Sequence, residues 1–141
     1  MTPIRVGFWR PRPPSLDTLL SDAFGVAHGK APLRSFAQTL GSFIHIGLPW
    51  PGDMIDATWD LRERRAVTAY VNHENFIGPR YMGHASCLLC NKLDNGAADC
   101  TDGIYVWPEG LGHYVETHSV KPPQEFVDHI IRELMRIAAT R

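Results

Sequence analysis

The sequence lacks a long hydrophobic run, a surplus of positive charge and a complete set of metal-binding cysteines. No apolar stretch approaches the roughly 18–20 residues that a helix needs to cross a bilayer, so we expect no membrane span. The net charge is -1, which argues against strong non-specific binding of nucleic acid, because such binding needs surplus cations to neutralise phosphates. Residues 1–12 lack an apolar core and a small-residue cleavage site, so we expect no signal peptide.

Internal repeats and low-complexity tracts are missing as well. A chain of 141 residues that is 44% hydrophobic and 21% charged is typical of one soluble globular domain, here expected over residues 1–141. The cysteines number three, which is odd for disulfide pairing. Without a secretory signal, this count indicates a reducing compartment such as the cytoplasm, where clustered cysteines more often bind metal than form disulfides.

The first half of the chain predicts a mixture of short elements. Hydrophobic periodicity, together with glycines and prolines that interrupt regular structure, predicts strands at residues 4–9 and 43–48 and helices at residues 15–25 and 33–40. A stronger helix signal begins at Asp60, where D-L-R-E resembles a capping box with Glu63 reaching back to the Asp60 backbone N–H. This helix should end near N-H-E-N and present apolar residues on its inner face, namely Leu61, Val67, Tyr70 and Val71.

The second half predicts a hairpin followed by two helices. Strands are expected at residues 80–87, 98–100 and 104–107, and a short helix at residues 108–118 with Pro108 at its first position. A last helix should follow Pro122 and Pro123. Its wide apolar stripe could cover two neighbours, or one neighbour and a partner in a homodimer, and comprises Phe126, Val127, Ile130, Ile131, Leu134, Met135 and Ile137. The prediction is a small α+β single domain with a zinc-finger-like C-terminal half, hairpin plus short helix, and a long final helix.

The cysteines and two histidines have the spacing of a metal site. Cys87 and Cys90 form a C-x2-C knuckle, and His113 and His118 complete the pattern C-x2-C-x22-H-x4-H. Two thiolates and two imidazoles satisfy tetrahedral Zn²⁺. Residues five apart on an ideal helix point about 140° apart, so His118 should lie at a distorted helix end. We therefore predict a zinc-binding subdomain at about residues 80–120.

Other interpretations of the cysteines stay open. Cys100 could replace one histidine as a third sulfur ligand, or it could be a buried free cysteine. Cys87 and Cys90 could also be reduced core cysteines. A C-x2-C redox motif is disfavoured, because it needs a following helix and the turn sequence N-K-L-D-N-G follows here.

The segment with these residues resembles a small family of uncharacterised bacterial proteins. The shared pattern is C-x-x-C, then N-G, then T-D-G-x-Y-x-W-P-E-G-L-x-H-Y-V-x-x-H, and the resemblance covers about residues 83–127. In that pattern the position of Cys100 need not be cysteine. The resemblance therefore favours Cys87, Cys90, His113 and His118 as the ligands, and it implies no activity.

A closed set of four protein ligands indicates structural rather than catalytic zinc, because catalytic zinc keeps a position for water. If one ligand were absent, Glu109, Glu116 or Asp102 could serve as general base to a bound water. The more ordinary roles are a helix-dipole partner for Glu109, a surface residue for Glu116 and a turn former for Asp102. H-Y-V-E-T-H does not have the spacing of metalloprotease helices.

The remaining candidates are weaker. His45 is expected in the core, and His73, His84 and His129 have no partner at a recognisable spacing. Trp107 is expected to cover the zinc site. The arginines Arg62, Arg64, Arg65 and Arg80 form either a basic patch or a solvated face. We expect a non-enzymatic binding or adaptor module with a protein partner in a bacterial cytoplasm; the alternatives are a zinc-dependent hydrolase and a nucleic-acid-binding module.

Overall fold

The computed structural model describes residues 2–9 and 48–141. The chain divides into two compact units: Met1–Phe8 with Pro51–Arg141, and Trp9–Trp50. All the elements below belong to the first unit. The predicted helices at 15–25 and 33–40, and the predicted strand at 43–48, lie outside the described residues, so the single domain expected over residues 1–141 stays a prediction.

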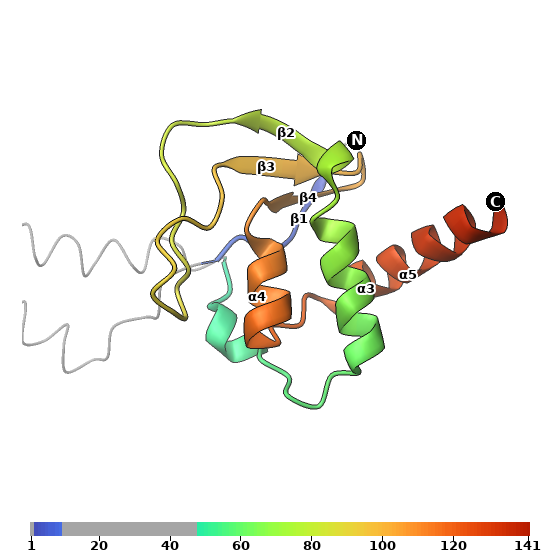
Figure 1. Cartoon of the computed structure of the whole chain (residues 1–141), viewed down its shortest axis with the longest axis horizontal. Helices are drawn as coiled ribbons and strands as arrows, with labels where there is room; N and C mark the ends of the chain where they lie inside the picture. Colours follow the sequence, from blue (N-terminus) through green and yellow to red (C-terminus); the bar gives the residue numbers. More distant parts are fainter. Residues whose placement is uncertain (1, 10–47) are drawn as a thin grey trace, which may run out of the picture. The chain divides into compact units, whose positions relative to one another are not determined.

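Four short strands form one mixed sheet in the order β1-β4-β3-β2 (Figure 1). β3 pairs antiparallel with both β2 and β4, and β1 pairs parallel with β4. β3 and β4 form the hairpin that the sequence predicted, with residues 102–104 between the two strands. The strands are β1 (Ile4–Arg5), β2 (Ile77–Arg80), β3 (Ala98–Thr101) and β4 (Tyr105–Pro108).

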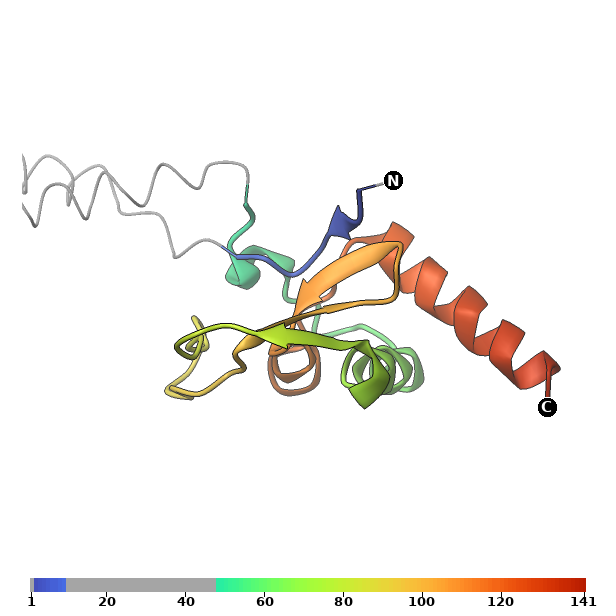
Figure 2. The same ribbon diagram turned by 90° about the horizontal axis from the view of Figure 1, so that it is seen from above.

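Helices cover one side of this sheet. α3 (Leu61–Val71) and α4 (Leu111–His118) lie side by side beneath the strands, and Figure 2 views both nearly end-on. α5 (Gln124–Ala139) begins beside them, and its second half extends beyond the sheet. Two 3-10 turns, η1 (Pro51–Met54) and η2 (Glu74–Phe76), complete the order. The predicted α+β fold with a long final helix is confirmed.

The start of α3 follows the predicted capping pattern in one half only. Asp60 accepts a hydrogen bond from the Glu63 N–H at 3.0 Å, as an N-cap should. The Glu63 carboxylate accepts from the Trp59 indole N–H at 2.8 Å. The sequence predicted that the Glu63 carboxylate would accept from the Asp60 backbone N–H. The Trp59 indole, which lies directly before the cap, is its donor instead.

The core forms around Trp107, which is fully buried. Its indole N–H donates to the Val71 carbonyl at 3.0 Å, and its ring contacts Phe76 and Phe126 at centroid distances of 5.6 and 5.5 Å. Trp107 thus joins β4 to α3 and α5. The expectation that Trp107 covers the zinc site is wrong, because its apolar surface is used in the core.

Two predicted boundaries are wrong, the first because regular pairing stops early and the second because pairing continues. The strand expected at 80–87 lies at 77–80, and Gly83 (φ 87°) and Gly96 (φ 98°) interrupt regular pairing beyond it. Pro108 ends β4 and does not open a helix. The Glu109 N–H continues the ladder by donating to the Ala98 carbonyl at 2.9 Å.

The second half of α5 is more exposed than its first half. Phe126, Val127 and Ile130 are fully buried, whereas Met135 is 67% and Ile137 39% exposed. The predicted apolar stripe therefore packs on the core only in its first two turns. Among the described residues, no helix is both long enough and apolar enough to span a membrane.

Candidate metal centre

Cys87 and Cys90 lie in the loop between β2 and β3, residues 81–97, here called the knuckle loop. The Cys87 N–H donates to the Lys92 carbonyl at 2.9 Å, which closes a tight turn around the C-x2-C sequence. The Leu89 N–H donates to Cys87 Sγ at 3.4 Å. A backbone donor aimed at sulfur favours the thiolate form that binds metal.

The base of the knuckle loop is fixed to the junction of β4 and α4. Asn95, which is buried, donates from its side-chain amide to the Gly110 carbonyl at 3.2 Å. The Ala97 N–H donates to Glu109 Oε2 at 2.9 Å. A Cβ atom on Gly110 would lie 2.1 Å from the Asn95 carbonyl oxygen, so glycine is required there. These contacts hold the cysteine loop beside α4 (Figure 1).

The two histidines come from α4, which ends irregularly just after His118. His118 is the last helical residue, and Ser119 follows with a left-handed φ of 55°. The Ser119 N–H donates to the Tyr114 carbonyl, five residues back, which is a π-type turn. The imidazole rings of His113 and His118 lie 5.0 Å apart between centroids, so both face the same side. The distorted helix end predicted from H-x4-H is present.

The four ligand atoms form one cluster. Cys87 Sγ lies 3.5 Å from His118 Nε2, and Cys90 Sγ lies 3.3 Å from His113 Nε2. All four atoms lie within 4.8 Å of one another. Tetrahedral zinc with bonds of about 2.3 Å to sulfur and 2.0–2.1 Å to nitrogen places sulfur and nitrogen ligands about 3.5 Å apart. The spacing of the cluster fits such an ion, and the structure brings together all four predicted residues.

Neighbouring polar groups orient the ligands. Thr117 Oγ1 lies 3.3 Å from His113 Nδ1, so with Nε2 directed at the cluster the Nδ1–H donates to the hydroxyl. The Tyr114 hydroxyl accepts from the Leu88 N–H at 2.8 Å, which ties the knuckle loop to α4. Tyr114 occupies the position expected for Trp107, since its ring lies 6.3 Å from the His118 ring.

Burial acts in opposite ways on the two kinds of candidate ligand: it favours the metal-binding form of the histidine and disfavours that of the cysteine. It lowers the pKa of His113, which keeps the imidazole neutral and its lone pair available near pH 7. It raises the pKa of the Cys87 thiol, and a bound divalent cation would offset that effect by stabilising the thiolate. Cys87 is buried and Cys90 is exposed, so the cluster lies at the surface.

Cys100 lies outside the cluster. It is 1% exposed in β3 and pairs with Ile77 on one side and Trp107 on the other. Burial raises the pKa of its thiol to about 11, which disfavours the thiolate that a metal needs. This placement agrees with Cys100 as a buried free cysteine.

The three candidate general bases have other partners or positions. Glu109 pairs with Arg80 at 3.1 Å in addition to its bond to Ala97, and its expected role as a helix-dipole partner stays a prediction. Asp102 accepts from the N–H groups of Ile104 and Tyr105, as expected of a turn former. Glu116 is exposed on α4, as expected of a surface residue.

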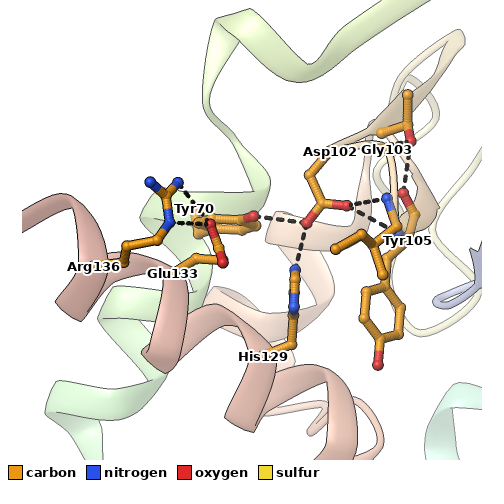
Figure 3. A network of polar contacts seen from close by, with 9 residues as sticks. Tyr70, Asp102, Gly103, Tyr105, His129, Glu133 and Arg136 are labelled. Carbon is orange, nitrogen blue, oxygen red and sulfur yellow. Dashed lines mark hydrogen bonds and ion pairs between the residues drawn. The ribbon is translucent and has the colours of Figure 1, made fainter.

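Sequence reasoning missed a buried network at the opposite end of the hairpin from the knuckle loop (Figure 3). Asp102 Oδ2 lies 2.7 Å from His129 Nε2 and accepts from the Tyr70 hydroxyl at 2.7 Å. His129, which has no partner at a recognisable spacing in the sequence, thus has a partner in Asp102. Asp102, Tyr70 and His129, here called the carboxylate network, join the β3–β4 turn to α3 and α5. A spacing pattern could not reveal it, because the three residues are far apart in sequence.

Two further histidines have local partners. His84 Nδ1 lies 2.8 Å from Asp94 Oδ1, with both side chains exposed, and His73 caps η2 by accepting from the Asn75 N–H at 3.2 Å. His45 lies outside the described residues.

Comparison of the chain with protein-family models, with curated proteins and with solved structures finds no match. The resemblance to the bacterial family therefore stays a prediction.

Proposed function

We propose that the protein binds one Zn²⁺ ion through Cys87, Cys90, His113 and His118, and that the ion is structural. The observation that carries this proposal is the cluster of two sulfur and two nitrogen atoms within 4.8 Å. Four protein donors fill the coordination of tetrahedral zinc and leave no position for a reacting water. Zinc would fasten the knuckle loop to α4, since each of these segments supplies two ligands.

We further propose that the protein is a non-enzymatic binding module of a reducing compartment such as a bacterial cytoplasm. Two of the three carboxylates that could act as general base are engaged elsewhere: Asp102 in the carboxylate network and Glu109 with Arg80. All three cysteines are free thiols, which suits a reducing environment. A zinc-dependent hydrolase would need an open metal position, and the four-ligand arrangement argues against one.

Metal analysis of variants tests the ligand set. Purified wild-type protein should contain one zinc per chain, and Cys87→Ser should lose most of it because a serine hydroxyl is a poor zinc ligand. Cys100→Ala is the matched control and should keep the full amount, since Cys100 lies outside the cluster. The measurement is elemental analysis of dialysed protein by mass spectrometry. Zinc-free wild-type protein, or equal loss of zinc from both variants, would contradict the proposal.

A further inference from the structure

A groove of about 510 Å³ lies between α3 and α4, separate from the metal cluster. Arg64, Arg65, Thr68 and Asn72 line it from the α3 side, and Glu116 lines it from α4. The two helices come very close at one point, because a Cβ atom on Gly112 would lie 2.0 Å from Asn72 Oδ1. The groove is therefore built into the packing of the two helices.

Its charge is unbalanced. Among the described residues, neither Arg64 nor Arg65 has a carboxylate within 4.0 Å, and Arg64 donates to the Ser119 hydroxyl. The acid that lies beside them in sequence, Glu63, accepts from the indole of Trp59. Glu116 supplies the one carboxylate among the lining residues, so two guanidinium groups face one carboxylate.

Some other cations of the described chain have an acidic partner. Arg80 pairs with Glu109 at 3.1 Å, and His84 pairs with Asp94 at 2.8 Å, although both line a second groove of about 310 Å³. Arg136 pairs with Glu133 at 2.9 Å. Arg64 and Arg65 are thus two cations in one groove, and the carboxylate of its lining, Glu116, forms an ion pair with neither of them.

The donors suit a tetrahedral oxyanion. A guanidinium group presents several N–H donors in a fixed plane that matches two oxygens of a phosphate. The Asn72 amide adds a donor at the same groove. Thr68 already donates to the Arg64 carbonyl at 2.9 Å, which leaves its oxygen only as an acceptor, so the arginines and Asn72 define the preference for an anion.

We propose that the α3–α4 groove binds a phosphate group, with Arg65 and Arg64 as the principal contacts. Two sources can present this chemistry: a small phosphorylated molecule, or the backbone of a single-stranded nucleic acid. The inference adds a ligand class to the binding module proposed above, but it does not depend on the metal being zinc.

The test is a titration of the metal-loaded full-length protein with inorganic phosphate at constant ionic strength, followed by ¹⁵N NMR. We expect saturable shifts of the amides of Arg64, Arg65 and Asn72. Arg65→Gln should weaken binding about tenfold through loss of a charge-assisted contact. Arg62→Gln is the matched control: it removes the same charge from an exposed residue of α3 that does not line the groove, and should weaken binding less than Arg65→Gln because it removes no direct contact with the phosphate.

A third variant sharpens the test. Glu116→Gln removes the carboxylate of the groove and should strengthen phosphate binding severalfold. Absence of saturable shifts in the millimolar range, or equal weakening by Arg62→Gln and Arg65→Gln, would overturn the proposal. Zinc content is measured in the same samples, so a failed metal site would be recognised separately from a failed phosphate site.

A second titration distinguishes the two sources, using single-stranded DNA without terminal phosphates. Binding tighter than that of inorganic phosphate, lost with Arg65→Gln and falling steeply with salt, would assign the groove to a nucleic-acid backbone. Phosphate binding without DNA binding would assign it to a small phosphorylated molecule. Either result supports the phosphate site.

Discussion

Removal of the metal by a strong chelator is expected to lower the free energy of unfolding by about 5 kcal/mol or more, because the free energy of binding structural zinc contributes directly to folding. Apart from the ion, hydrogen bonds rather than apolar packing hold most of the knuckle loop. It contains no strand, and Tyr81, Met82, Leu88 and Leu93 are all exposed, with Met82 fully so. Without the ion, the loop would keep its backbone hydrogen bonds and the contacts of Asn95 and Ala97.

The measurement is urea unfolding followed by circular dichroism, with and without chelator, and after zinc is restored. His118→Ala should reproduce the loss in the presence of zinc. His84→Ala is the matched control, because His84 lies in the same loop region and pairs with Asp94 where both side chains are more than half exposed. It should cost at most about 1 kcal/mol, as surface ion pairs do. Unchanged stability after complete removal of the metal would contradict a structural role.

Replacement of Asp102 by alanine is expected to cost about 3–5 kcal/mol, since it removes one partner from a buried network and leaves the others unpaired. Asp102 accepts four hydrogen bonds, from the backbone of Ile104 and Tyr105 and from the side chains of Tyr70 and His129. The Asp102 and His129 side chains are 6% and 8% exposed, so water cannot replace the lost contacts.

The chain contains its own control for this variant. Asp94 and His84 form an aspartate–histidine pair at 2.8 Å, nearly the same distance as the 2.7 Å between Asp102 and His129, but on the surface. Asp94→Ala should cost at most about 1 kcal/mol. Urea unfolding of both variants measures the difference, and equal costs would show that burial of the network contributes nothing.

The same network predicts the behaviour of the protein in acid. Burial alone would raise the pKa of Asp102, but the hydrogen bonds from Tyr105, Tyr70, His129 and Ile104 lower it overall. Its contribution to stability is therefore complete above the ordinary aspartate pKa of 3.8 and is lost as the pH falls through the lower folded value. In Asp102→Asn this part of the loss of stability at low pH should be missing.

The cluster of Cys87, Cys90, His113 and His118 could be predicted because metal chemistry restricts the residue types and spacings of such a site. Zinc accepts few residue types at limited spacings, so C-x2-C and H-x4-H were informative before any fold was known. The same spacing required a distorted end of α4 at His118, and the structure has a left-handed Ser119 there. Strongly periodic segments such as α3 and α5 were equally accessible, since one apolar face identifies them.

Other features depended on contacts between segments far apart in the chain. Pro108 has the local character of a helix start, but pairing with β3 keeps it in a strand. Trp107 follows the hairpin turn and precedes the ligands, yet its partners come from α3 and α5. His129 had no partner in the sequence because Asp102 lies 27 residues away. Register and side-chain pairing of this kind are decided by packing, which no local pattern contains.

X-ray absorption at the zinc edge tests the central claim most directly, because it reports the number and type of atoms bound to the ion. A structural Cys2His2 site predicts two sulfur atoms at about 2.3 Å and two nitrogen atoms at about 2.0–2.1 Å from the zinc ion. In the wild type no water should be bound to the ion, and in His113→Ala one of the two nitrogen ligands should be lost. A third sulfur atom would assign Cys100 to the site. An absent ion, or an oxygen from water in place of one protein ligand, would contradict the structural role proposed here.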